Sequence, residues 1–152
     1  TWAAEHNCPS KTDAIGNLII YVPASEGYEN RPALILQGHM DMVWQKTPES
    51  KHDFERDPIQ LIRDGDWLRA NGTTLGADNG IGIALMMSLV EDESVKHPPL
   101  ELLLTVEEEM GVVGADHLDR KSITRRLPTP GTIRPGRKRK TRRTTSTRKK
   151  RS

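Results

Sequence analysis

Residues 33–41, ALILQGHMD, decide the fold of this chain. Four of the first five side chains are apolar, and such a short run is typical of a strand covered on both faces in a parallel or mixed sheet. The run leads directly into Gly38, His39 and Asp41. Because ligands bind at the carboxyl ends of strands in open α/β sheets, these polar residues are the first candidates for a functional site.

Further elements follow from apolar pattern and turn residues. Residues 17–22 and 100–106 predict two more strands of this sheet, and residues 81–91 have the apolar spacing of a helix. The Asp-Gly pair at residues 64–65 predicts a hairpin between 59–62 and 67–70. Residues 2–5 read as helical, and another helix is expected to begin within 114–121. This order predicts an α/β fold with a mixed, partly parallel sheet.

The charge of the chain divides it into two unlike parts. All 21 acidic residues of the 152-residue chain lie within residues 1–123, whereas 13 of the 23 Lys and Arg residues lie within 124–152. The second part holds two aliphatic side chains, Leu127 and Ile133, and cannot bury enough apolar surface to offset its ordering entropy. We therefore expect one folded domain over residues 1–123 and a disordered basic tail over residues 124–152.

The tail allows a second class of function. Its Lys and Arg runs would bind nucleic-acid phosphates with strong salt dependence and without sequence preference. It has no aromatic residue on which bases could stack. Nucleic-acid binding is thus an alternative to enzyme function, and a solvated or artefactual tail is the simpler interpretation.

Cysteine content and hydropathy suggest a compartment. Cys8 is the single cysteine, so no internal disulfide can form and a reducing compartment is expected. No run of 18 apolar residues predicts a transmembrane helix, and no signal-peptide pattern opens the chain. The expected location is cytoplasmic, with no membrane partner.

Polar clusters occur at three equivalent places in the predicted fold. His39 and Asp41 follow one strand, Asp78 precedes the helix, and Glu108 and Glu109 follow another strand. If the strands run parallel, the three clusters meet at one edge of the sheet. Imidazole with several carboxylates suits Zn²⁺, Co²⁺ or Mn²⁺. Each cluster alone also fits a plain turn or a solvated charge run, so the residue pattern leaves both interpretations open.

The same residues carry a family resemblance. LQGHMDMV at 36–43, TLGADNGIG at 74–82 and LTVEEEMG at 104–111 resemble the metal-site motifs of the M20 metallopeptidases. The motif aspartate lies 39 residues after the histidine, and the last glutamate lies 31 residues after the aspartate. Within that family the chain is most similar to the aminoacyl-histidine dipeptidases, with added cues in residues 45–59. The resemblance covers residues 1–123 and implies part of a three-layer α/β/α zinc-peptidase catalytic domain.

The resemblance also implies roles for individual residues. His39 would bind one of two zinc ions, Asp78 would bridge both, and Glu109 would bind the other. Asp41 would accept a hydrogen bond from His39 and fix its tautomer. Glu108 would be the general base that activates water for attack on a dipeptide of the Xaa-His type. An intact homologue could form a homodimer.

The sequence also departs from the family pattern. The family places a further aspartate after the Glu-Glu motif and a histidine near the end of the domain, but no Asp or Glu follows Asp119 and no His follows His117. We therefore expect a truncated chain that binds metal weakly and hydrolyses little. The sequence of residues 124–152, which contains no Asp or Glu, resembles an out-of-frame translation. A non-catalytic fragment of peptidase ancestry is the remaining alternative.

Overall fold

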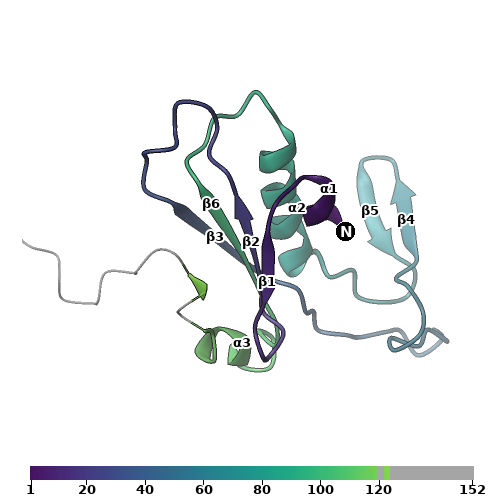
Figure 1. Cartoon of the computed structure of the whole chain (residues 1–152). Coiled ribbons are helices and arrows are strands. Elements are labelled where there is room, and N and C mark those ends of the chain that lie inside the picture. Colours follow the sequence, from purple (N-terminus) through teal and green to yellow (C-terminus); the bar gives the residue numbers. More distant parts are fainter. Residues whose placement is uncertain (120–121, 124–152) are drawn as a thin grey trace, which may run out of the picture.

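The computed structural model describes residues 1–119, 122 and 123, and Figure 1 shows their arrangement. The predicted basic tail, with its nucleic-acid alternative, lies outside the described residues. Within the described part, no helix has the length and apolarity needed to cross a bilayer.

The described chain forms a four-stranded sheet, a separate hairpin and three helices (Figure 1). The sheet has the order β1-β2-β6-β3. The elements are α1 (Trp2–Glu5), β1 (Ser10–Thr12), β2 (Leu18–Val22), β3 (Leu34–His39), β4 (Leu61–Asp64), β5 (Trp67–Ala70), α2 (Ala77–Glu91), β6 (Leu100–Thr105) and α3 (Val113–Asp116). The sequence predicted all of these except β1, whose three residues are polar or charged, although β4 lies two residues later than the predicted 59–62.

The sheet is mixed, as predicted. β3 runs parallel to β6, with Leu34 opposite Leu100 and His39 opposite Thr105. β2 runs antiparallel to β6 on the other side, and β1 extends the sheet antiparallel to β2. β3 and β6 therefore end at the same edge of the sheet, which places the residues after both strands together.

The hydrophobic core lies between the sheet and α2. Every residue of β6 is buried, and Leu100, Leu102 and Leu104 pack with Met86 of α2 and with side chains of β2. The chain after β6 returns across the opposite face, where the Tyr21 hydroxyl donates a hydrogen bond of 2.6 Å to the carbonyl of Ser122. Helix α2 thus covers one face of the sheet and the chain after β6 contacts the other face, in agreement with the predicted α/β class.

Helix α2 begins earlier than the predicted residue 81. It starts at Ala77, directly after Gly76, whose φ of 76° belongs to the left-handed region that glycine adopts without strain. Asp78 and Asn79 within this first turn have non-helical backbone angles. The regular helix therefore begins close to the predicted start, and Asp78 sits on a distorted turn that leads into it.

Candidate metal centre

His39 is the buried member of the predicted site. It is the last residue of β3, and its side chain is 7% exposed. Its Nδ1 lies 2.9 Å from the carbonyl oxygen of Asp41, and its Nε2 lies 3.1 Å from Oδ1 of Asp78. Because a carbonyl only accepts hydrogen bonds, Nδ1 carries a proton and Nε2 is directed at the acidic residues.

The surroundings of His39 favour positive charge at Nε2. Burial alone would lower the pKa of His39, but the hydrogen bond to the Asp41 carbonyl, the hydrogen bond to Asp78 and the nearby charges of Asp41 and Glu108 raise it above its usual value. With acceptors at both ring nitrogens, the ring is satisfied as an imidazolium or with a cation at Nε2. Electrostatics at this position thus suit a cation.

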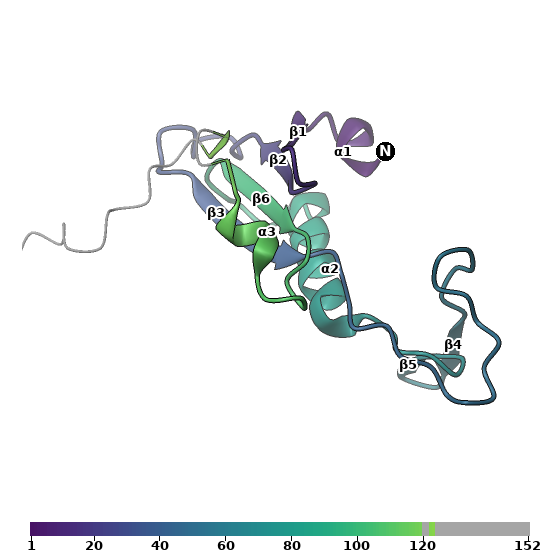
Figure 2. The ribbon, with the colours of Figure 1, turned by 90° about the horizontal axis from the view of Figure 1, so that it is seen from below.

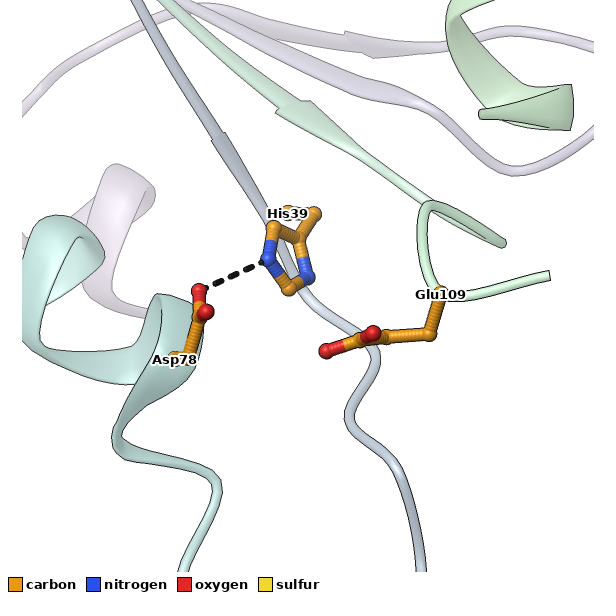
Figure 3. Close-up of side chains that lie close together, drawn as sticks. All are labelled: His39, Asp78 and Glu109. Carbon is orange, nitrogen blue, oxygen red and sulfur yellow. Dashed lines mark hydrogen bonds and ion pairs between the residues drawn. The ribbon is translucent and has the colours of Figure 1, made fainter. Parts of the chain in front are cut away.

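Asp78 reaches the site from the opposite side. It lies in the first turn of α2, after the loop that returns from the hairpin, and its side chain is 83% exposed. Figure 3 shows its carboxylate facing the imidazole of His39 across the gap between α2 and the end of β3. The sequence placed Asp78 in a loop before the helix, whereas the structure places it in the distorted first turn of α2.

Glu108 and Glu109 enter from the turn after β6. Oε2 of Glu108 lies 3.9 Å from Nε2 of His39. The carboxylate of Glu109 points into the same space (Figure 3). Its backbone N–H donates a hydrogen bond of 3.1 Å to Oδ2 of Asp41. The two neighbouring glutamates therefore both reach the site.

Asp41 contacts His39 differently from the sequence expectation. The close hydrogen-bond partner of the His39 ring is the Asp41 carbonyl, whereas Oδ1 of the Asp41 carboxylate lies 3.5 Å from Nδ1. This Oδ1 is buried without a hydrogen-bond partner. Burial raises the pKa of Asp41, but hydrogen bonds from backbone N–H groups, with those of Glu108 and Glu109 foremost, and the charge of His39 hold it below its usual value. The Asp41 carboxylate therefore stays ionised and ties the turn after β3 to the turn after β6.

His39, Asp78 and Glu109 together form a cluster in which one ligand atom of each lies within 4.8 Å of the others. Among residues 1–119, 122 and 123 this is the one such group of three. A cavity of about 300 Å³ adjoins it, lined by Gln37, Thr105, Val112 and Ala115 beside the site residues. One nitrogen and two carboxylate donors match the mixed ligand sets of zinc sites, in which neighbouring donors stand about 3.4 Å apart. Small side-chain movements would close the cluster around an ion, so the residues fit the implied metal.

Comparison with known proteins identifies the family. The family described as "Peptidase family M20/M25/M40" matches residues 35–134, which is more than half of the chain. This chain belongs to that family. His39, Asp78 and Glu109 all lie within the matched range.

Several M20 relatives are similar over most of this chain. It is 52% identical over 114 residues to the cytosol non-specific dipeptidase of Escherichia coli, covering 75% of this chain and 24% of the relative. The aminoacylhistidine dipeptidase of Vibrio alginolyticus matches with a TM-score of 0.71 and 48% identity, covering 77% of this chain and 24% of that chain. The aminopeptidase PepT of Bacillus cereus matches with a TM-score of 0.63 and 27% identity, covering 81% of this chain and 33% of that chain. The chain spans about a quarter of the length of the curated relatives it matches.

Some residues of this M20 site were not found from the sequence. Gln37 and Thr105 line the cavity and are hydrogen-bonded to each other at 3.1 Å, although both lie in predicted strands. The available signal was that Gln37 and Thr105 are polar residues near the ends of two otherwise apolar strands; Thr105 is buried and requires a hydrogen-bond partner. The His-Asp-Phe segment at residues 52–54, which supported the resemblance, is outside the metal cluster.

Proposed function

We propose that this chain carries metal-binding and proton-transfer residues of a dipeptide hydrolase. The proposal rests on one observation: His39, Asp78 and Glu109, from three distant segments, bring their ligand atoms within 4.8 Å of one another. Membership of the M20 family and similarity to two dipeptidases favour peptide hydrolysis as the use of such a cluster.

His39 Nε2 and the carboxylates of Asp78 and Glu109 would hold the cation, and Zn²⁺ is the proposed ion, with two ions as in the family. Co²⁺ and Mn²⁺ suit the same donors. A bound metal of this kind acts as a Lewis acid and lowers the pKa of water to about 7. Because Asp78 is largely exposed and three donors form the cluster, we expect this polypeptide to bind metal weakly.

Glu108 is the proposed general base. Its carboxylate lies 3.9 Å from His39 Nε2 and borders the cavity, so it can reach a water molecule placed there. Glu108 takes a proton from this water as the oxygen attacks the peptide carbonyl, and it returns the proton to the departing amine. The neighbouring Glu107 does not line this cavity and is the proposed bystander.

Asp41 is proposed to position both sides of the site. Its carbonyl fixes the His39 tautomer, and its carboxylate accepts the hydrogen bond from the Glu109 N–H. An outer partner of this kind typically contributes about 10–100-fold in metal affinity or activity.

The proposed substrate is a dipeptide, and the proposed location is the cytoplasm. The E. coli relative is named a cytosol dipeptidase, and the Vibrio structure is named an aminoacylhistidine dipeptidase. A histidine at the C-terminal substrate position is thus the first preference to test, and a homodimer stays a prediction for an intact homologue.

Metal binding by the full 152-residue chain tests the ligand assignment. Titration with Co²⁺, followed by absorption and calorimetry, should show binding that His39→Ala, Asp78→Ala and Glu109→Ala each weaken by at least about 10-fold. His97→Ala is the matched control, because His97 precedes β6 at the opposite edge of the sheet. Equal binding by the His39 and His97 variants would overturn the assignment.

Glu108 is tested against its neighbour. Metal-supplemented hydrolysis of an Xaa-His dipeptide should be slow with the wild-type chain and fall further, by about 10²-fold or more, in Glu108→Gln. Glu107→Gln should keep the wild-type rate. A Glu108→Gln chain as fast as the wild type would remove Glu108 from the mechanism.

A further inference from the structure

Two glycines from different elements border the side chain of Asn79. Gly38 lies in β3, one residue before His39, and Gly82 lies in α2. A Cβ atom built on Gly38 would stand 2.7 Å from Oδ1 of Asn79, and one built on Gly82 would overlap the same oxygen. Real Cβ atoms do not approach so closely. The absence of side chains at both positions therefore creates a slot that holds the Asn79 amide.

The amide in this slot also contacts the proposed ligand next to it. Nδ2 of Asn79 lies 3.4 Å from Oδ1 of Asp78, and His39 Nε2 lies 3.1 Å from that same oxygen. Asp78 is largely exposed and sits on a turn with non-helical backbone angles, so neither burial nor a regular helix fixes its direction. The only neighbours that hold its carboxylate in the described structure are thus His39 and Asn79.

We infer that Asn79 is a positioning residue, anchored between Gly38 and Gly82, that directs the Asp78 carboxylate toward His39. This inference rests on the proposed function, because it assigns Asn79 a role through a proposed metal ligand. The anchor joins α2 to the end of β3, so the two ligands from these elements keep their relative placement before any cation binds. A plain structural role for Asn79 would instead affect only the stability of the first turn of α2.

Glycine substitutions in α2 separate these roles, because α2 contains a matched control. A Cβ on Gly80 meets nothing within 4 Å, whereas a Cβ on Gly82 overlaps Asn79. Alanine is favoured over glycine within helices, so Gly80→Ala should leave Tm unchanged or raise it. Gly82→Ala should lower Tm by about 4 °C or more, because overpacking outweighs the gain in helix propensity.

The double variant Asn79→Ala with Gly82→Ala distinguishes positioning of Asp78 from a purely structural role of Asn79. Removing the amide empties the slot, so the added methyl group should no longer clash and Tm should return at least to that of Asn79→Ala alone. Co²⁺ affinity should stay about 10-fold below wild type in both chains, because the contact to Asp78 is lost. This split between restored stability and unrestored metal affinity is the result that a purely structural role does not produce.

Each alternative result is informative. If Gly82→Ala behaves like Gly80→Ala, the slot does not exist and the inference fails. If Asn79→Ala binds Co²⁺ as tightly as wild type, Asn79 does not position Asp78. If the wild-type chain and His39→Ala bind Co²⁺ equally poorly, the proposed metal centre fails and the role of Asn79 toward it fails too, while the two Tm comparisons still decide whether the slot is real.

Discussion

The four-stranded sheet and the β4–β5 hairpin are built from similar apolar residues but bury them very differently. Leu102 at the centre of β6 is 1% exposed, whereas Trp67 in β5 is 74% exposed. In Figures 1 and 2 the hairpin stands away from the sheet and from α2. An isolated two-stranded hairpin is only marginally stable in water. The free energy of unfolding of this chain should therefore come mainly from the sheet and its core. The hairpin should add little to it.

The proposed metal centre takes ligands from the sheet side and from the start of α2, just after the segment that returns from the hairpin. His39 belongs to the buried end of β3, while Asp78 follows the chain that returns from the hairpin. One ligand is thus fixed by the core, and the other depends on a short distorted turn. This difference explains why Asp78, and not His39, requires an additional anchor.

The largest contrast between the two regions is expected from leucine truncation. Leu102→Ala should lower the free energy of unfolding by about 2–5 kcal/mol, because it leaves a cavity among fully buried neighbours. Leu68→Ala in β5, a site 54% exposed, should change it by less than about 0.5–1 kcal/mol. Urea unfolding of both variants gives the comparison. Similar losses would show that the hairpin belongs to the same cooperative core.

Substitution of the buried Asn17 should cause the next largest loss in the free energy of unfolding. Asn17 is fully buried before β2; its Nδ2 donates to the carbonyl of Gly114 at 2.8 Å, and its Oδ1 accepts from the Val106 N–H at 3.1 Å. Asn17→Ala leaves both backbone groups without this partner, at a cost of about 1–3 kcal/mol for each group left unsatisfied. Urea unfolding measures the loss. Asn30→Ala, in an exposed loop, is the control, and an equal effect of the two would contradict this role.

The strands and the site motifs were predictable because their signals are local. The apolar runs of β3 and β6 differ from their surroundings in composition, and the Asp-Gly pair marks the hairpin, although its loop is Gly65-Asp66 and Asp64 ends β4. Parallel pairing of β3 with β6 then brings the polar residues after both strands together. The residue pattern thus predicted the sheet and marked the candidates around His39, while their proposed roles came from the resemblance to the M20 metallopeptidases.

Other features were not predictable because they depend on pairs of residues far apart in the chain. The three-residue strand β1 forms by pairing with β2 and has no apolar pattern of its own. Asn17 is recognisable as a bridge only when β2 and the turn after β6 are adjacent. The Asp41 carbonyl, which bonds to His39, is a backbone group that carries no sequence signal. Long-range hydrogen bonding is the physical information that a local pattern omits.

Asp13, in the turn that leads into β2, should contribute a smaller, pH-dependent part of the free energy of unfolding. Oδ1 of Asp13 accepts hydrogen bonds from the N–H groups of Ile15, Gly16 and Asn17, and Oδ2 accepts from Asn17 Nδ2. Slight burial raises the pKa of Asp13, but these hydrogen bonds outweigh it and lower the pKa below its usual value. The stability that this ionised group contributes is complete above about pH 4, the unfolded pKa, and is lost as the pH falls through the lower folded pKa.

Unfolding experiments between pH 6 and acid conditions test this linkage. The difference in free energy of unfolding between wild type and Asp13→Asn should be greatest near neutral pH and should shrink in acid, because the variant has no proton to take up at this position. Contributions from all other carboxyl groups cancel in the difference. A difference that stays constant with pH would show that Asp13 has the same pKa in the folded and unfolded chain.

The smallest effect is expected from the ion pair of the hairpin, between Arg69 and Asp64. Both side chains are well exposed, and such surface pairs contribute about 0–1 kcal/mol. Arg69→Ala should change the global free energy of unfolding by less than about 0.5 kcal/mol, yet it should speed amide hydrogen exchange in β4 and β5, which open locally. Exchange in β6 should stay unchanged, because those amides open only with the core. If Arg69→Ala changed the rate of amide hydrogen exchange equally in the hairpin and in β6, the hairpin and the sheet would unfold as one unit. The turn that carries Asp78 would then share the stability of the core.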